Sequence, residues 1–358
     1  MEKVNLNDKH TVEILDYSAD GAGVARLGNG YVVFVDGAVR GDVCEIAITK
    51  ALPRACCAKI EELIKPSAHR IKVDCPVFGR CGGCDYRHIS YEEELFAKRK
   101  RVSDALRRIG SVEIEVEEIL STGKINGYRN NIQLKSDKNK IGFYSKNSHE
   151  IVEIKKCLLV NEDMNEAIRQ GSVNIRTTTE KIGDLTFCIS SEAFFQVNTE
   201  AALLLYEKAR EYADLKPHEF LLDLYCGTGA ITLFLGRGTK AALGVELNAA
   251  AIADAKENAA RNGIKNVEFL CVDAAELDTS GLLPDCVTVD PPRKGLSPGA
   301  LRKIEELAPA RVIYISCDPA TLARDIKRLE SYEVKRASAV DMFPRTRHVE
   351  CVVLLNRK

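Results

Sequence analysis

An apolar run ends in a glycine-containing turn at Phe220-Leu221-Leu222-Asp223-Leu224-Tyr225-Cys226-Gly227-Thr228-Gly229. Glycines at such a turn let a ligand approach the backbone, and the start of the helix that follows offers free N–H groups. A Gly-x-Gly pair is weak evidence when it stands alone. The stretch therefore predicts a strand, a turn and a helix, and the residues around it have to show whether a ligand binds there.

Downstream of about residue 185, apolar strands alternate with amphipathic helices. Strands are predicted at 220–224, 241–245, 267–271, 287–289 and 312–315, and helices at 249–261, 298–307 and 321–329. A terminal strand pair is predicted at 334–339 and 349–355. This alternation is typical of a parallel, doubly wound α/β sheet.

Acidic residues stand where the later strands of this sheet end. Glu246 closes the second strand, where a carboxylate binds both hydroxyls of a ribose. Asp273 ends the third strand, near the expected adenine position, and Asp290 ends the fourth strand inside the crevice where doubly wound sheets bind ligands. The third glycine of the dinucleotide fingerprint is missing from Gly227-Thr228-Gly229-Ala230-Ile231-Thr232. The pattern favours S-adenosylmethionine over a nicotinamide cofactor.

A second set of residues is a group of cysteines. Cys75, Cys81 and Cys84 lie close together among glycines, and Cys157 follows at a distance. Such a set suits an iron–sulfur cluster, and four cysteines equally suit a tetrahedral zinc site. The chain has 13 cysteines, an odd number in a chain that looks cytosolic, so we expect no disulfide framework. The spacing predicts a metal site and leaves the metal open.

A third set lies at the end of the fifth strand. Ser316-Cys317-Asp318-Pro319 precedes a helix, whose dipole can lower the pKa of a thiol. His348-Val349-Glu350 enters the last strand, and without Cys317 this glutamate would be interpreted as a surface charge. Cys317 is a candidate nucleophile. Three other cysteines are expected to be small buried residues: Cys271, Cys286 and Cys351.

The first 64 residues are expected to form a small β unit. Short apolar and β-branched segments are separated by glycine-containing turns at 20–23, 28–30, 36–37 and 40–42. Four or five such strands predict a barrel of OB-like character. This pattern is equally compatible with a structural cap that binds no ligand.

Residues 65–184 combine the cysteines with many basic side chains. A helix is predicted from about 91 to 109, with basic residues at Lys98, Arg99, Lys100, Arg101, Arg107 and Arg108. Tyr128, Phe143 and Tyr144 lie among the basic residues that follow. Cations hold phosphates and aromatic rings stack bases, as single-stranded RNA requires; the alternative is a solvated helix face. A net charge of −1, from 51 basic and 52 acidic residues, does not decide between them.

The three sets together resemble the bacterial 23S rRNA 5-methyluridine methyltransferases, which have a TRAM domain and a 4Fe-4S cluster. The resemblance covers essentially the whole chain. It includes Asp20-Gly21-Ala22-Gly23-Val24-Ala25 and Val33-Phe34-Val35, which look like TRAM, and Phe195-Gln196-Val197-Asn198. The resemblance implies a TRAM-like RNA-binding β-barrel at 1–64, a small central α+β domain that binds the cluster and RNA at 65–184, and a Rossmann-like class I methyltransferase domain at 185–358.

The same resemblance assigns roles to individual residues. Cys317 matches the nucleophile that adds to carbon 6 of uracil, and Glu350 matches the base that removes the proton from carbon 5. The family's cluster ligands correspond to Cys75, Cys81, Cys84 and Cys157. The positions on the side of S-adenosyl-L-methionine correspond to Gln196, Tyr225, Gly227, Glu246, Asp273 and Asp290.

Two departures from the family pattern are visible. The stretch between Cys157 and Gln196 looks abbreviated, and Asp318 stands where many relatives have asparagine. The related tRNA enzyme usually lacks both the barrel and the cluster, so 23S rRNA, with its uridine flipped out of a single-stranded or loop region, is favoured over tRNA. A non-catalytic iron–sulfur RNA-binding protein is the alternative from another class.

Two other methyltransferase classes fit less well. Cytidine-C5 enzymes commonly carry a Pro-Cys after the fourth strand, where this chain has Pro291-Pro292-Arg293. Amino-group enzymes share an Asp-Pro-Pro motif but have no cysteine nucleophile. No run of about 18 apolar residues occurs, and no signal-peptide pattern stands at the N-terminus. We expect a cytoplasmic monomer without a membrane partner.

Overall fold

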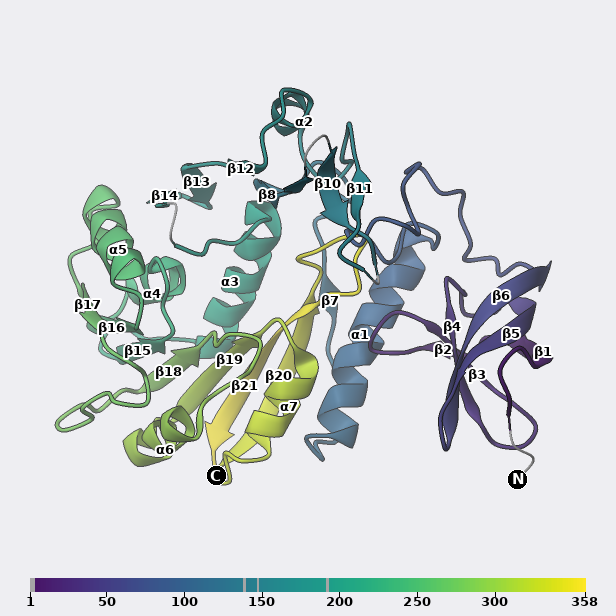
Figure 1. Ribbon diagram of the computed structural model, residues 1–358. Helices are drawn as coiled ribbons and strands as arrows, with labels where there is room; N and C mark the ends of the chain where they lie inside the picture. The colour runs from purple at the N-terminus through teal and green to yellow at the C-terminus, as the bar shows by residue number, and fades with distance from the viewer. Residues whose placement is uncertain (1–3, 138–139, 147, 191–192) are drawn as a thin grey trace. The chain divides into compact units, whose positions relative to one another are not determined.

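The computed structural model describes residues 4–137, 140–146, 148–190 and 193–358 (Figure 1). It divides the chain into two compact units. The first unit comprises Met1–Ala97, Leu134–Lys156 and Arg345–Arg347, and the second comprises Lys98–Gln133, Cys157–Pro344 and His348–Lys358. Among the described residues, no helix is long and apolar enough to cross a membrane.

The first unit contains a six-stranded sheet in the order β1-β5-β6-β4-β3-β2. Its strands are β1 (Lys9–Glu13), β2 (Asp16–Tyr17), β3 (Gly23–Arg26), β4 (Val32–Asp36), β5 (Val43–Ala51) and β6 (Ala55–Lys65). Alternate side chains of β5, namely Cys44, Ile46 and Ile48, are fully buried, as the two-residue period of a strand requires. A Cβ at Gly23 would lie 2.8 Å from both Ala38 and Ile14, so glycine permits the close packing there. The predicted small barrel-like β unit is confirmed.

A three-stranded sheet, β11-β10-β9, completes the first unit's regular structure. It consists of β9 (Lys135–Asp137), β10 (Lys140–Tyr144) and β11 (Ile151–Glu153). The loop that contains Cys81 lies against this sheet. Gly82 N donates to Tyr144 O at 3.0 Å, and the backbone of Cys81 forms an isolated antiparallel β-bridge with Ser145. Helix α1 (Tyr91–Arg108) starts in this unit and continues in the second.

The second unit is built on an eight-stranded sheet in the order β17-β16-β15-β18-β19-β21-β20-β7. Five strands run parallel: β15 (Phe220–Leu224), β16 (Ala241–Glu246), β17 (Val267–Cys271), β18 (Cys286–Val289) and β19 (Arg311–Ser316). β21 (Glu350–Arg357) is antiparallel to β19 and to β20 (Tyr332–Val340), and β7 (Ile119–Leu120) ends the sheet. The predicted doubly wound sheet and its terminal strand pair are confirmed.

Helices cover both faces of this sheet (Figure 1). One apolar core contains residues of α3 (Thr199–Ala213), α4 (Ala230–Gly236) and α5 (Ala249–Arg261). The other contains residues of α1, α6 (Pro298–Leu307) and α7 (Pro319–Ile326). Successive residues of β15 point into opposite cores, Leu221 into the first and Leu222 into the second, so both sheet faces are buried and only the strand ends are available for a ligand.

Smaller elements complete the second unit. They are α2 (Glu162–Arg169), the strand pair β8 (Asn131–Gln133) and β12 (Asn174–Arg176), and the pair β13 (Thr179–Ile182) and β14 (Leu185–Cys188).

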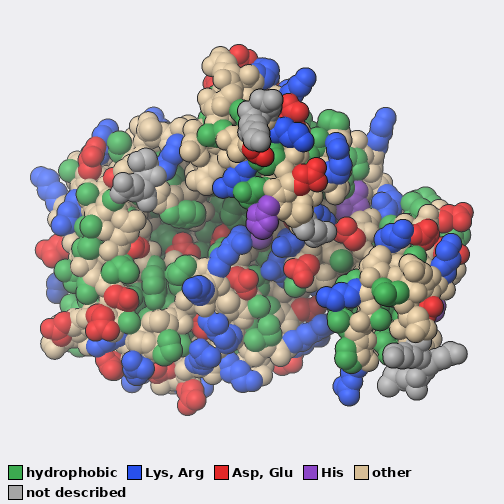
Figure 2. Space-filling model, in the orientation of Figure 1, with side chains coloured by type: hydrophobic (Ala, Val, Ile, Leu, Met, Phe, Trp, Pro, Cys, Tyr) green, Lys and Arg blue, Asp and Glu red, His purple; other side chains and the backbone are tan. Residues whose placement is uncertain are grey.

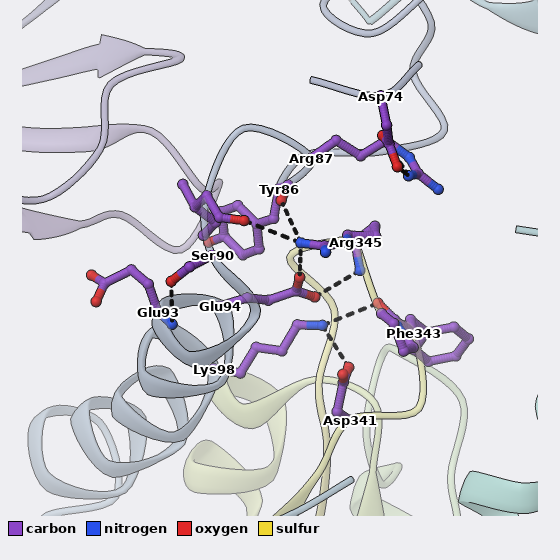
Figure 3. Close-up of polar contacts among 12 residues, drawn as sticks. Asp74, Tyr86, Arg87, Ser90, Glu93, Glu94, Lys98, Asp341, Phe343 and Arg345 are labelled. Carbon is purple, nitrogen blue, oxygen red and sulfur yellow. Dashed lines mark hydrogen bonds and ion pairs between the residues drawn. The ribbon is translucent and has the colours of Figure 1, made fainter. Parts of the chain in front are cut away.

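A buried ion pair fixes α1 to the loop that follows β20. Lys98 Nζ lies 2.6 Å from Asp341 Oδ1 and also donates to Phe343 O at 3.0 Å (Figure 3). Both charged side chains are excluded from solvent, at 1% and 0% exposure. A buried carboxylate without its cation is far more costly than an exposed one.

We expect Lys98→Met to lower the free energy of unfolding by about 3–5 kcal/mol, because Asp341 loses the opposite charge in a buried place. Urea denaturation followed by circular dichroism measures this change. The matched control is Lys303→Met, which breaks a pair with Glu306 whose carboxylate is exposed and should change stability by less than about 1 kcal/mol. Equal effects of the two substitutions would contradict the importance of the buried pair.

Candidate active site

The turn after β15 is shaped by three residues with positive φ. Tyr225 has φ 66°, Gly227 53° and Gly229 81°. A positive φ is unusual for a bulky residue such as Tyr225 and marks a strained, functionally interesting backbone. A Cβ at Gly229 would lie 2.9 Å from the Phe269 ring, whereas at Gly227 it would point into open space. The open side of the turn is therefore at Gly227, where the sequence predicted a ligand.

Glu246 lies directly against this turn. Its Oε2 accepts from Gly227 N at 3.2 Å and its Oε1 accepts from Asn248 N at 2.9 Å. The carboxylate is thus held at the end of β16 by two backbone donors, one of them in the glycine turn. The structure brings Gly227 and Glu246 together as the sequence predicted.

Two more predicted cofactor residues lie near one another on the same edge. Asp273 follows β17, and its Oδ1 accepts from Ala275 N at 2.8 Å. Burial raises the pKa of Tyr225, a hydrogen bond with Ser297 opposes the shift, and the charge of Asp273 adds to it. Both residues follow parallel strands, β15 and β17, which end at the same edge of the sheet.

Strand register places Glu350 beside Cys317. Ser316, the last residue of β19, pairs with Cys351 of β21. Because the two strands are antiparallel, Cys317, which follows Ser316, lies opposite Glu350, which precedes Cys351. Glu350 is 4% exposed, and Cys317 is half-buried. Asp318 caps α7 by accepting from Ala320 N at 2.9 Å and Thr321 N at 3.0 Å. An acid at 318 therefore has a local structural role.

The charges around Cys317 act on its thiol in the direction opposite to the sequence expectation. Burial raises the pKa of Cys317 to about 11, and the carboxylates of Glu350 and Asp290 add to this effect, while Arg293 opposes it. The expectation that the start of a helix lowers the pKa of Cys317 was wrong. Desolvation and two nearby acids outweigh the dipole of the short helix α7.

Glu350 and Asp290 form an acidic pair. Burial raises the pKa of Glu350 well above its usual value, Asp290 raises it further, and Arg293 lowers it. Burial also raises the pKa of Asp290 to about 7, with a contribution from Asp223. Two neighbouring buried carboxyl groups cannot both ionise easily, so the pair holds a proton near neutral pH. Both groups are suited to exchange protons with a substrate.

Two residues of this site were missed at the level of sequence. Arg293 opposes the rise in the pKa of the Cys317 thiol, and the run Asp290-Pro291-Pro292-Arg293 offered the signal. Asp223 is fully buried and accepts from Thr232 Oγ1 and Thr288 Oγ1, each at 2.6 Å. Burial raises its pKa to about 6, so it adds negative charge beneath the glycine turn.

Gln196 lies in the segment between β14 and α3 and is 6% exposed. Its backbone oxygen accepts from Asn130 Nδ2 at 3.1 Å, and Val197 O accepts from Asn130 N at 3.0 Å. Among the contacts of the described residues, none joins the Gln196 side chain to the other predicted cofactor residues. Its role toward the cofactor stays a prediction.

The four predicted metal ligands are divided between the two units. Cys75, Cys81 and Cys84 are partly exposed residues of the first unit, and Cys157 belongs to the second. Within the described parts of the chain, no group of three or more His, Cys, Asp or Glu residues is arranged to hold a metal ion. The donor chemistry of four thiols fits a cluster or zinc, and a metal bound by these residues stays a prediction.

Two family models match the chain, one described as TRAM domain at residues 3–60 and one as tRNA (Uracil-5-)-methyltransferase at residues 174–358. An RNA methyltransferase of Clostridium tetani is 33% identical, with 98% of this chain and 97% of the relative covered. One of Halalkalibacterium halodurans is 32% identical, with 99% and 98% covered. The first alignment runs over 447 positions, whereas the chain has 358 residues, so that relative carries segments that this chain lacks.

One solved structure is similar over almost the whole chain. It is the Pyrococcus abyssi tRNA (uracil-54, C5)-methyltransferase in complex with S-adenosyl-L-homocysteine, at 26% identity and a TM-score of 0.77. The match covers 96% of this chain and 99% of that one.

Proposed function

The chain belongs to the tRNA (uracil-5-)-methyltransferase family, and from that premise we propose that it methylates carbon 5 of specific uridines in 23S rRNA. The predictions of an RNA uracil-5 methyltransferase, of S-adenosylmethionine as methyl donor and of a TRAM domain are confirmed by the family models and relatives. The choice of 23S rRNA, the residue roles and the 4Fe-4S cluster are proposals. The observation that carries the chemistry is the register that sets Glu350 beside Cys317.

The proposed mechanism begins with Cys317. Its thiolate adds to carbon 6 of uracil, and the electron pair of the 5,6 double bond moves toward the carbonyl at carbon 4, which makes carbon 5 nucleophilic. Bound S-adenosylmethionine supplies an electrophilic methyl group. After carbon 5 has gained that group, Glu350 removes its proton, the double bond re-forms and the Cys317 thiolate leaves.

The pKa shifts fit this sequence of proton movements. The raised pKa of Cys317 favours the neutral thiol, so a neighbouring group must accept its proton before attack. Glu350 and Asp290 are beside it, and their raised pKa values bring them closer to neutral pH, where proton transfer in both directions is efficient. Arg293 stabilises the thiolate by its charge.

tRNA is the second candidate substrate. The Pyrococcus abyssi structure is named as a tRNA enzyme and covers 96% of this chain, and the matching family model is also named for tRNA. Because the match to this tRNA enzyme covers nearly the whole chain, the TRAM domain does not distinguish the two substrates, and the proposal of 23S rRNA rests on the resemblance that the four cysteines carry. Labelled methyl transfer to unmodified 23S rRNA and tRNA transcripts tests it: label in rRNA is expected, and label in tRNA alone would contradict the rRNA assignment while leaving the chemistry intact.

We propose that Cys75, Cys81, Cys84 and Cys157 hold a 4Fe-4S cluster with a structural role. The support is the donor set, four thiols outside any catalytic role, three of them in a loop with glycines. Anaerobically purified protein should contain about four iron and four acid-labile sulfide per chain, and Cys84→Ser should lose them. Zinc in place of iron, or no metal at all, would overturn the assignment.

An RNA-contacting surface is proposed on the second unit beside the candidate active site. This basic ridge consists of exposed or half-exposed side chains of Arg293, Lys294, Arg324, Lys327, Arg328, Arg107 and Arg108. Arg324 Nη2 donates to Lys294 O at 2.7 Å, and Lys327 Nζ donates to Ser111 Oγ at 3.3 Å, so α7 joins the loop after β18 to the end of α1. Figure 2 shows Lys and Arg side chains gathered over α7, below a hollow in front of α3. α7 begins directly after Cys317-Asp318, so phosphates next to a bound uridine would meet this ridge.

We expect the double substitution Lys327→Glu/Arg328→Glu to weaken RNA binding by at least about 10-fold at 0.1 M salt. The slope of a plot of log K against the logarithm of the salt concentration should become shallower by about 1–2. Filter binding at several salt concentrations measures both. The matched control is Lys256→Glu/Lys265→Glu, which reverses two exposed lysines around α5 and the edge strand β17. Equal weakening by both double variants would indicate a general charge effect and contradict the ridge.

We also expect the enzyme to be a cytoplasmic monomer.

A further inference from the structure

The loop 341–349 connects β20 to β21 and leads directly into Glu350. Asp341 and Met342 are fully buried, although loops usually lie on the surface because their backbone groups need partners. Three side chains from distant parts of the second unit supply such partners at the start of this loop. Lys98 Nζ donates to Asp341 and to Phe343 O (Figure 3). Tyr128 Oη donates to Pro344 O at 3.0 Å, and Asn198 Nδ2 donates to Met342 O at 3.1 Å.

Asn198 uses both ends of its amide. Its Oδ1 accepts from Ala201 N at 3.2 Å and caps α3, while its Nδ2 donates to the 341–349 loop. The side chain is 1% exposed. A helix cap requires only an acceptor, which serine supplies as well as asparagine, so the donor on Met342 O is an additional feature of this residue.

The residues just before Asn198 are the Gln196-Val197 segment. Both of their carbonyl oxygens accept from Asn130. The segment is therefore held on one side by Asn130 and tied on the other, through Asn198, to the loop that carries Glu350. Asn198 therefore links the Gln196 segment to Met342. Met342 lies two residues beyond Val340, the last residue of β20, which pairs with Glu350.

We propose that Asn198 is a positioning residue that fixes Glu350 relative to the Gln196 segment; this inference rests on the proposed function. The chemistry requires such a link, since carbon 5 of uracil receives the methyl group and then loses its proton to Glu350. The methyl donor and the base must both be aligned on one atom, and a misplacement of about 1 Å can cost about 100-fold in rate. Asn198 aligns the base and touches neither substrate.

The test is Asn198→Ser, which keeps the cap on α3 and is too short to reach Met342 O. In single-turnover reactions with RNA and S-adenosylmethionine, decay of the methylated RNA–protein adduct should slow by about 10-fold, while its formation changes little. The adduct then accumulates on denaturing gels. Tyr128→Phe, which removes only the bond to Pro344 O, should shift the same ratio in the same direction.

The matched control is Asn266→Ser. Asn266 Nδ2 donates to two backbone carbonyls, Gly236 O and Thr239 O. Neither acceptor belongs to the 341–349 loop. Adduct formation and decay should keep their wild-type ratio in this variant. If Asn198→Ser slows both steps equally, or lowers the melting temperature without adduct accumulation, Asn198 is only a cap and the inference is overturned. If the wild-type protein methylates no RNA, the proposed function itself falls, and the inference with it.

Discussion

Cys317→Ala is expected to reduce methyl transfer to uridine by at least about 10⁴-fold, since removal of a covalent nucleophile eliminates the pathway rather than weakening it. Without the thiolate, carbon 5 of uracil remains too weak a nucleophile to take the methyl group. The binding of S-adenosylmethionine should be preserved, because Gly227 lies in the turn after β15, Glu246 ends β16, and their contact does not involve the thiol. Single-turnover methylation and calorimetric titration with the cofactor measure the two effects.

A second cysteine provides the control for this prediction. Cys57 is also partly exposed but lies on β6 of the first unit, and Cys57→Ala should methylate at the wild-type rate. If Cys317→Ala kept even a tenth of the activity, a covalent mechanism through this residue would be wrong.

Glu350→Gln is expected to separate methyl transfer from product release. The adduct through Cys317 should form and become methylated, but loss of the proton from carbon 5 should slow by about 10²–10⁴-fold without the base. The substitution is isosteric and removes a buried acid whose pKa is raised, so folding should be maintained. Labelled RNA that migrates with the protein on a denaturing gel measures the trapped species.

The pH dependence of release follows from the same pKa shift. Glu350 acts as a base only when it is deprotonated, and burial with Asp290 raises its pKa. The rate of release in the wild-type protein should therefore rise with pH above the usual carboxylate range, and this rise should be absent in Glu350→Gln. The control is Asp318→Asn, the same acid-to-amide change next to Cys317, which keeps the cap on α7 and should stay within a few-fold of wild type. Wild-type turnover by Glu350→Gln would contradict the assignment of the base.

The positions of the main site residues were predictable from sequence because parallel strands end at one edge of a sheet. The predicted strands 220–224 and 267–271 match β15 and β17, and the predicted helix 249–261 matches α5. Once the strand order is known, Gly227 and Glu246 must meet, as must Cys317 and Glu350. Local patterns carried this information, since each residue stands directly after or before a strand.

Features that depend on tertiary partners were not predictable. Lys98 was grouped with the basic residues of a helix expected to face RNA or solvent, but it is 1% exposed and pairs with Asp341, far along the chain. Tyr128 was grouped with aromatic residues available for stacking, but it is buried and bonds to Pro344. Those assignments were wrong for these two residues, since helix periodicity does not identify the partner of a buried charge.

The expectations for the lone cysteines were correct in part. Cys286 and Cys351 are buried, whereas Cys271 is exposed. Cys271 lies on β17, the edge strand of the sheet, and an apolar strand sequence does not reveal whether a strand is at the edge or in the centre.

The central claim is that Cys317 attacks carbon 6 of a uridine and Glu350 removes the proton from carbon 5. RNA with 5-fluorouridine at the target position tests it most directly, because fluorine at carbon 5 leaves no proton for Glu350 to remove. With S-adenosylmethionine, the wild-type protein should form a stable methylated adduct, and mass spectrometry of its peptides should place the modified nucleotide on Cys317. An adduct on another residue, or full release of methylated RNA from this analogue, would contradict the account.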